Sequence, residues 1–289
     1  MKVLIIGLGE VGLPTASHVA MQKLETWTYD ISKVAVDRAK QDGIRATTKW
    51  SEIPHKTIDA YIICVSTSLD SYLKPDMSAV INVCRKIEHS KKRKVLVSIE
   101  STLAIGTCKK VYTRIFNNSV DLVHVPHRFW KEDPINHGVK QLRVIGGVNE
   151  HSLEAGLDFY QRQLAIPLHA VSSVELAEMS KVVENSYRFL QIAFAEELRM
   201  ICDEHRMDMN ELRKACNTKW NTEILEARDG VLRHCLPKDI RYLISYSRNA
   251  VLVEGAVSVD EKYRRYLSKS PMRQDRQHLG RQAPTKRNG

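Results

Sequence analysis

A glycine-rich segment near the N-terminus has the residue types and spacing to bind a dinucleotide. The segment Gly7-Leu8-Gly9-Glu10-Val11-Gly12 directly follows the apolar run Lys2 to Ile6 and precedes a helical pattern. Glycines at these positions allow a tight turn and a close approach of the backbone to a pyrophosphate, which the N-terminus of the following helix attracts. The alternative for these glycines is a plain tight turn.

Asp30 follows the next predicted strand, 18 residues after Gly12. A carboxylate at this spacing accepts hydrogen bonds from the adenosine ribose and repels a 2′-phosphate, so the sequence predicts NAD rather than NADP as the cofactor. The alternative for Asp30 is that it caps the next helix.

Cys235 has the most cationic surroundings of the six cysteines. Arg233 and His234 precede it and Lys238 follows it, and such neighbours stabilise the thiolate, which is the reactive form of cysteine. Cys108 has cations on one side only. The alternative for Cys235 is a buried structural cysteine.

No pattern predicts a metal. The cysteines form no C-x-x-C pair and no His/Cys cluster at zinc spacing, and His124-x-x-His127 is the only suggestive histidine pair. The N-terminus is not typical of a signal peptide, because glycines, Pro14 and Glu10 interrupt it. We therefore expect reduced thiols and a cytoplasmic protein.

Lys181 and Asn185 are four residues apart in a long helical pattern, so they share one face of that helix. An ammonium and an amide side by side could stabilise a developing oxyanion. The alternative is a solvated polar face, to which Glu184 and Arg188 belong, although Lys181 lies among apolar neighbours.

Short β-branched runs that alternate with amphipathic stretches predict the elements that position these residues. This alternation is typical of a doubly wound α/β domain with a parallel sheet, which we expect over residues 1–172. The predicted strands are 2–6, 26–29, 60–64, 94–99, 122–125 and 142–145, and the predicted helices are 14–21, 31–41, 77–89, 105–116 and 152–163.

A helical period from Val174 to about His205 predicts one helix of some 30 residues. Such a rod has more apolar positions than a small domain can cover, so we expect it to form the interface of a homodimer. Shorter helices are predicted at 209–216, 238–246 and 257–267, which makes residues 173–267 an all-helical dimerisation domain.

Half of the net charge of +10 lies in the C-terminal segment. Residues 269–289 hold six cations and one acid and no aromatic residue, so we expect the segment 268–289 to be a disordered basic tail rather than a nucleic-acid site. The mildly basic remainder suits an anionic small substrate. No apolar run approaches the roughly 18 residues of a membrane span.

Five motifs, in order, resemble those of the UDP-glucose/GDP-mannose dehydrogenase family. The resemblance runs from Met1 to about Leu267 and rests on the glycine-rich segment extended to Pro14 and on four others. These are Cys64-Val-Ser-Thr-Ser-Leu69, Glu100-Ser-Thr-Leu103, Glu178-Met-Ser-Lys-Val-Val-Glu-Asn185 and His234-Cys-Leu-Pro-Lys-Asp239.

The resemblance implies a four-electron, NAD-dependent oxidation of a nucleotide sugar's C6 alcohol to a carboxylate. It implies that Cys235 captures the intermediate aldehyde as a thiohemiacetal that becomes a thioester. Thr102 and Asp239 would position the hydrolytic water, although Asp239 could instead cap a helix. Further residues implied to contact the cofactor are Ser66, Thr67 and Thr102, and those implied to contact the sugar are His127, Lys181, Asn185 and Arg233.

Three departures from the family's pattern bear on this reading. Pro126-His127-Arg128 stands where the family has Pro-Glu, and Lys131 replaces another Glu. The first Glu is implicated in acid/base work, which His127 could take over because an imidazole titrates in the right range. Leu232 and Arg233 replace glycines. The family also continues into a third, nucleotide-sugar-binding domain, whereas here the resemblance ends near Leu267, as in a short form.

Two other functions fit the same residues. A two-electron hydroxy-acid dehydrogenase also combines a Rossmann domain with a long helical domain and a Lys-x-x-x-Asn pair, but it gives no reason for Cys235. A catalytically impaired, NAD-binding dimer with a regulatory or binding role would account for the altered Glu and the short chain.

Overall fold

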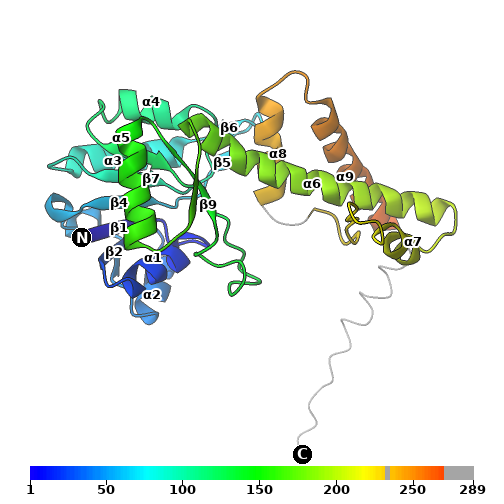
Figure 1. Cartoon of the computed structure of the whole chain (residues 1–289), viewed down its shortest axis with the longest axis horizontal. Coiled ribbons are helices and arrows are strands. Elements are labelled where there is room, and N and C mark those ends of the chain that lie inside the picture. The colour runs from blue at the N-terminus through cyan, green and yellow to red at the C-terminus, as the bar shows by residue number, and fades with distance from the viewer. Residues whose placement is uncertain (232–234, 270–289) are drawn as a thin grey trace, which may run out of the picture. The chain divides into compact units, whose positions relative to one another are not determined.

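The computed structural model describes residues 1–231 and 235–269, and its first part is built on a sheet of eight strands (Figure 1). The strands of this sheet are β1 (Lys2–Ile6), β2 (Glu25–Tyr29), β3 (Ala46–Thr47), β4 (Ala60–Ile63), β7 (Leu96–Ile99), β8 (Asp121–His124), β9 (Arg143–Gly147) and β10 (Leu168–Ala170). Their spatial order is β10-β9-β8-β7-β4-β1-β2-β3. Six neighbouring strands of this sheet, β3-β2-β1-β4-β7-β8, have the strand order of a dinucleotide-binding fold.

Alternation along the strands divides the core into two layers. In β1, Leu4 and Ile6 pack with α3 (Ser78–Ser90) and α4 (Thr107–Arg114) on one face of the sheet. Val3 and Ile5 pack on the other face with α1 (Gly12–Met21), α2 (Lys33–Gln41) and α5 (Glu150–Leu157). Helices therefore cover both faces, which confirms the doubly wound α/β fold.

The pairing departs from a purely parallel sheet at one place. β8 and β9 are antiparallel, with Val123 opposite Gly147, while the other pairs of this sheet are parallel. A separate hairpin joins β5 (Ser68–Leu69) to β6 (Pro75–Asp76). These short strands, with β3 and β10, carry too few residues for a periodicity argument to detect.

The helical part contains α6 (Val174–Glu204), α7 (Met209–Cys216), α8 (Cys235–Ser245) and α9 (Val251–Lys269). Its core joins Phe189 and Ala193 of α6 to Ile240 of α8 and Val257 of α9. The long helix was predicted at nearly these bounds. α8 begins three residues earlier than predicted, because Pro237 lies in its first turn, where a missing N–H breaks no intrahelical bond.

In the first part of the chain, too, some elements differ from those predicted. Residues 158–163, predicted as the end of one helix, form a separate π-helical turn (Asp158–Gln163) after α5. Two 3₁₀ turns lie at Trp50–Glu52 and His55–Thr57. None of the helices that the structure describes is both long and apolar enough to cross a bilayer.

The chain divides into two compact units, Met1–Val182 and Val183–Gly289. The division falls inside α6, about ten residues after the predicted domain boundary at 172, because the first turns of this helix pack with the sheet domain through buried Val174. The predicted basic tail lies almost entirely outside the described residues.

Candidate active site

The glycine-rich turn between β1 and α1 has a backbone that side chains would obstruct. Gly7 has φ +93°, and a Cβ there would lie 2.6 Å from the carbonyl oxygen of Cys64. A Cβ on Gly12 would lie 1.8 Å from the Gly7 carbonyl oxygen, so both positions require glycine.

Gly9 is different, because a Cβ built on it would meet no described atom within 4 Å. Val11, the N-cap residue of α1, provides no side-chain cap within the described part of the chain. The turn therefore presents open backbone at Gly9 beside an uncapped helix N-terminus, and these residues fit the pyrophosphate of NAD.

Asp30 ties the end of β2 to this turn. Its Oδ2 accepts a hydrogen bond from the Leu8 backbone N–H at 2.6 Å, and its Oδ1 accepts one from the Ser32 N–H at 2.7 Å. The N-cap of α2 is Ser32 rather than Asp30. Arg38, which sequence reasoning missed, donates to the Leu8 carbonyl at 2.9 Å. No sequence signal singled out Arg38, since a basic residue is ordinary near a helix C-terminus.

Hydrogen bonds connect the loop after β4 to the loop after β7, and they involve residues that were predicted to contact the cofactor. The Thr67 hydroxyl donates to the Thr102 carbonyl at 3.0 Å, and the Ser101 hydroxyl donates to the Val65 carbonyl at 2.6 Å. The structure therefore brings Thr67 and Thr102 together, while Ser66 is exposed.

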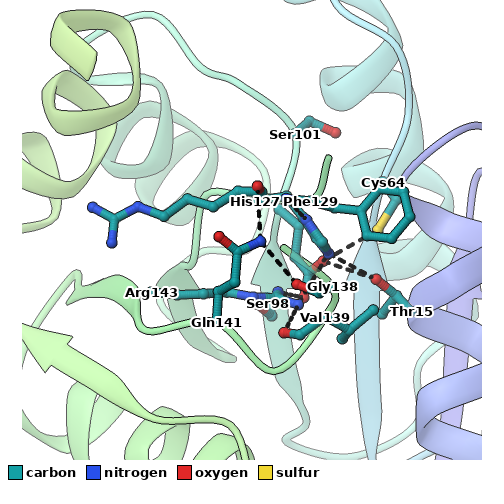
Figure 2. A network of polar contacts seen from close by, with 12 residues as sticks. Thr15, Cys64, Ser98, Ser101, His127, Phe129, Gly138, Val139, Gln141 and Arg143 are labelled. Carbon is teal, nitrogen blue, oxygen red and sulfur yellow. Dashed lines mark hydrogen bonds and ion pairs between the residues drawn. The ribbon is translucent and has the colours of Figure 1, made fainter. Parts of the chain in front are cut away.

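His127 lies inside a buried polar network (Figure 2). Its Nδ1 accepts a hydrogen bond from the Phe129 N–H at 2.9 Å, and its Nε2 lies 2.9 Å from Nη2 of Arg143 and 3.2 Å from the Thr15 hydroxyl. Burial lowers the pKa of His127 well below its usual range, and the charges of Arg143 and Lys181 lower it further. The ring is therefore neutral near neutral pH, and both of its nitrogens face protein groups.

The network is centred on a buried ion pair between Glu100 and Arg143. Arg143 Nη1 lies 2.8 Å from Glu100 Oε1, with side-chain exposures of 1% and 0%. Tyr160 donates to the same oxygen at 2.7 Å, and its hydroxyl lies 2.7 Å from that of Ser98. A charged residue at the start of a β-branched strand was the one signal that could have singled out Arg143.

Cys64 is the cysteine of this network. Its thiol lies 3.6 Å from Oε2 of Glu100. Burial raises the pKa of that thiol well above its usual range, and the charge of Glu100 raises it further. Cys64 is therefore a protonated thiol, unsuited to be a nucleophile.

Lys181 and Asn185 both belong to α6, on the shared face that their spacing predicts. Lys181 lies near enough to His127 for its charge to lower the pKa of that ring. Within the second unit, the Asn185 amide donates to Oδ2 of Asp239 at 2.5 Å.

Asp239 is 1% exposed, and each of its carboxylate oxygens lies beside a partner. In addition to Asn185, Lys238 places its Nζ 2.7 Å from the other carboxylate oxygen, and this ammonium lies 4.5 Å from the centre of the Tyr242 ring. Asp239 is the fifth residue of α8, so it does not cap that helix.

Cys235 is the first residue of α8 and is exposed. All six cysteines lie in the described residues, and the other five are buried or half-buried. The predicted substrate contact Arg233 lies outside the described residues, as do Leu232 and His234.

Comparisons with known proteins agree along most of the chain. Residues 43–164 match the NAD binding domain of the UDP-glucose/GDP-mannose dehydrogenase family, and residues 175–261 match its central domain. A UDP-N-acetyl-D-mannosamine dehydrogenase of Methanococcus maripaludis is 30% identical over 93% of this chain and 67% of its own. An NDP-N-acetyl-D-galactosaminuronic acid dehydrogenase of Ralstonia solanacearum is 29% identical, over 91% of this chain and 69% of its own.

Solved structures of nucleotide-sugar dehydrogenases are also similar to this chain. The UDP-D-ManNAc dehydrogenase of Pyrococcus horikoshii superimposes with a TM-score of 0.82 at 27% identity, covering 91% of this chain and 69% of its own. A 3-hydroxyisobutyrate dehydrogenase of Salmonella typhimurium reaches 0.68 at 15% identity, covering 91% of this chain and 93% of its own, which shows a shared fold only.

The present chain spans about two thirds of the length of the nucleotide-sugar dehydrogenases it matches. Because both domains match in the expected order and a relative is 30% identical over 67% of its length, the chain belongs to the UDP-glucose/GDP-mannose dehydrogenase family.

Proposed function

We propose that this NAD-dependent dehydrogenase oxidises the C6 alcohol of a UDP- or GDP-linked sugar to the uronic acid through a thioester on Cys235. The position of Cys235 is the observation that carries the proposal: it is the exposed cysteine, it begins α8, and it precedes buried Asp239 by four residues. Curated relatives named for N-acetylated sugars favour a 2-acetamido sugar as the substrate.

The sheet domain holds the cofactor in this proposal. The turn from Gly7 to Gly12 would hold the pyrophosphate and Asp30 would accept hydrogen bonds from the adenosine ribose. Thr67 and Thr102, in the neighbouring loops, would line the cofactor. NAD, when bound, accepts the hydride that the substrate carbon loses in each oxidation.

In the first oxidation the C6 alcohol loses a hydride and a proton to become an aldehyde. Negative charge develops on the C6 oxygen as the proton leaves, and the Lys181 ammonium and Asn185 amide stabilise it. The proton passes to a water held by Asp239.

Cys235 then divides the second oxidation into two easier steps. Its thiolate adds to the aldehyde carbon, and the resulting alkoxide takes up a proton to give a thiohemiacetal. Loss of a hydride and a proton from this group leaves a thioester. Water, positioned by Asp239 and Thr102, adds to the thioester carbon and the C–S bond breaks. The products are a carboxylate, the restored thiolate and two protons.

His127 has a supporting part in the proposal. Its ring is neutral and its nitrogens face Phe129, Thr15 and Arg143, so as placed it offers no lone pair to a substrate. We assign it to the packing of the Glu100–Arg143 pair, next to Lys181, rather than to proton transfer on the thioester.

The test is turnover with a panel of UDP-N-acetyl-mannosamine, UDP-glucose and GDP-mannose in the presence of NAD. Mass spectrometry should identify the uronic acid of one of them, and Cys216→Ser, which alters a half-buried cysteine outside the proposed site, should match the unaltered chain. Oxidation of hydroxy acids alone would support the two-electron reading. Binding of NAD without any turnover would support the regulatory reading.

A further inference from the structure

Glu178 is a fully buried carboxylate to which the reaction above assigns no task. Its Oε2 accepts a hydrogen bond from the Gly106 N–H at 2.6 Å, and its Oε1 accepts one from the Cys108 N–H at 2.7 Å. Gly106 is the N-cap residue of α4 and has φ +80°, with no side chain to cap the helix. Glu178, on α6, therefore supplies the cap that α4 lacks.

The geometry suits a carboxylate in particular. Two backbone N–H groups converge on two oxygens, and the negative charge lies at the positive end of α4. Burial raises the pKa of Glu178 above its usual range, and the two backbone hydrogen bonds offset part of that rise.

The loop between β7 and α4 is thereby held at both ends by buried carboxylates. Glu100 holds the end near the strand through Arg143 and Tyr160, and Glu178 holds the end near the helix. Thr102 lies between these two anchors, with its carbonyl fixed by the Thr67 hydroxyl.

The same carboxylate is one helical turn from Lys181. The two residues are three apart on α6, and Lys181 in turn lies near His127, which adjoins Glu100. A single side chain therefore connects the segment of α6 that carries Lys181 to the loop that carries Thr102, and all these residues belong to the first compact unit.

We infer that Glu178 is a positioning residue that fixes Thr102 relative to Lys181, and thus the water-holding group relative to the oxyanion-stabilising group. The inference rests on the proposed function. It gives a reason for a buried carboxylate at a position where an apolar helix contact would otherwise suffice.

Three variants test it. Glu178→Leu removes both acceptors, Glu178→Gln keeps one oxygen and loses the charge, and Glu175→Gln is the matched control. Glu175 lies on the same helix and pairs with the side chain of Lys109 on the same α4 at 2.6 Å. The Gly106 and Cys108 N–H groups donate to Glu178 instead. The measurements are kcat, the KM for NAD, the KM for the sugar and the hydrogen exchange of the Gly106 and Cys108 amides.

We expect kcat to fall by about 10-fold in Glu178→Gln and about 100-fold in Glu178→Leu, because small misplacements of reacting groups have large effects. The KM for NAD should change much less than kcat, by no more than about threefold, because Thr102 is only one of the groups beside the cofactor and the glycine-rich turn and Asp30 are unaltered. The two amides should exchange faster. Glu175→Gln should stay within about twofold in every measurement. If Glu178→Leu fails to fold, the fall of kcat in Glu178→Gln still tests the inference.

Two results would overturn the inference while leaving the proposed function intact. One is faster amide exchange with kcat unchanged, which would make Glu178 a stability residue only. The other is a parallel loss of kcat and NAD affinity, which would indicate general damage to the domain. No turnover by the unaltered chain would instead overturn the proposed function, and the inference with it.

Discussion

Cys235 and Lys181 contribute to different steps, so their substitution should have distinguishable effects. Cys235→Ser should still permit slow formation of aldehyde, but it should lower complete turnover by on the order of 10³-fold, because a hydroxyl is far less nucleophilic than a thiolate. Lys181→Ala should slow both oxidations by on the order of 10²-fold, because the oxyanion is common to them.

Stopped-flow recording of NADH with product analysis separates the two effects. Cys216→Ser is the control, since that cysteine is half-buried and outside the proposed site. Complete four-electron turnover by Cys235→Ser would contradict the thioester route. So would inactivation by alkylation of another cysteine while Cys235 stays unmodified.

Asp30 combines two tasks that one substitution can separate. Asp30→Asn keeps an oxygen for the Leu8 N–H but removes the charge that repels a 2′-phosphate. Calorimetry should show NAD binding reduced by no more than about 10-fold and NADP binding improved, whereas Asp30→Ala should weaken both by also releasing the turn. Equal affinity of the unaltered chain for NAD and NADP would contradict this role.

Glu196 provides a pH-dependent test of the helical unit. It is fully buried, and burial together with the charge of Asp260 raises its pKa to about 8. Below the unfolded pKa of about 4.5, a glutamate with a raised folded pKa does not change the free energy of unfolding. As the pH rises from there toward 8, it lowers the free energy of unfolding increasingly. Glu196→Gln should therefore raise the Tm by roughly 5 °C at pH 8.5 and by much less at pH 5. An equal shift of Tm at both pH values would show that the charge of Glu196 is not the cause.

At the scale of the element, α6 carries an unusual apolar stripe. Five exposed side chains recur at intervals of seven and four residues on one face, and 42–61% of each is exposed: Leu176, Val183, Tyr187, Phe194 and Ile201. Heptad spacing of this kind is typical of a helix that packs against another helix. We therefore predict a homodimer through α6.

Sedimentation at micromolar concentration should give about twice 33.0 kDa. Phe194→Glu should dissociate the dimer, because it places a charge in the apolar stripe, whereas Arg188→Glu, off the stripe on the same helix, should not. A monomer of the unaltered chain would show that the stripe does not mediate self-association.

The elements also show what sequence periodicity can predict. The long helix was located to within about one residue, because its apolar period is sustained over 31 residues. The start of α8 was placed three residues too late, because a proline in the first turn, here Pro237, does not interrupt a helix. The antiparallel pairing of β9 could not be predicted, because strand direction depends on the course of the long connection from residue 125 to 142 rather than on the strand's own residues.

At the scale of the molecule, local motifs were easier to predict than contacts between distant segments. The glycine-rich turn and the Lys181–Asn185 face are set by residues within a few positions of each other. The ion pair of Glu100 with Arg143 joins residues 43 apart, and the contact of Glu178 with Gly106 joins residues 72 apart. Charged residues of this kind read as ordinary surface positions until the fold buries them together.

The central claim is that one chain performs two successive oxidations of the same carbon. The most direct measurement is the number of NADH formed per molecule of sugar, with the nucleotide sugar limiting and NAD in excess. Our account predicts two NADH per sugar and a carboxylate product. One NADH per sugar with release of an aldehyde or ketone would contradict it, because the thioester on Cys235 would then have no part in the reaction.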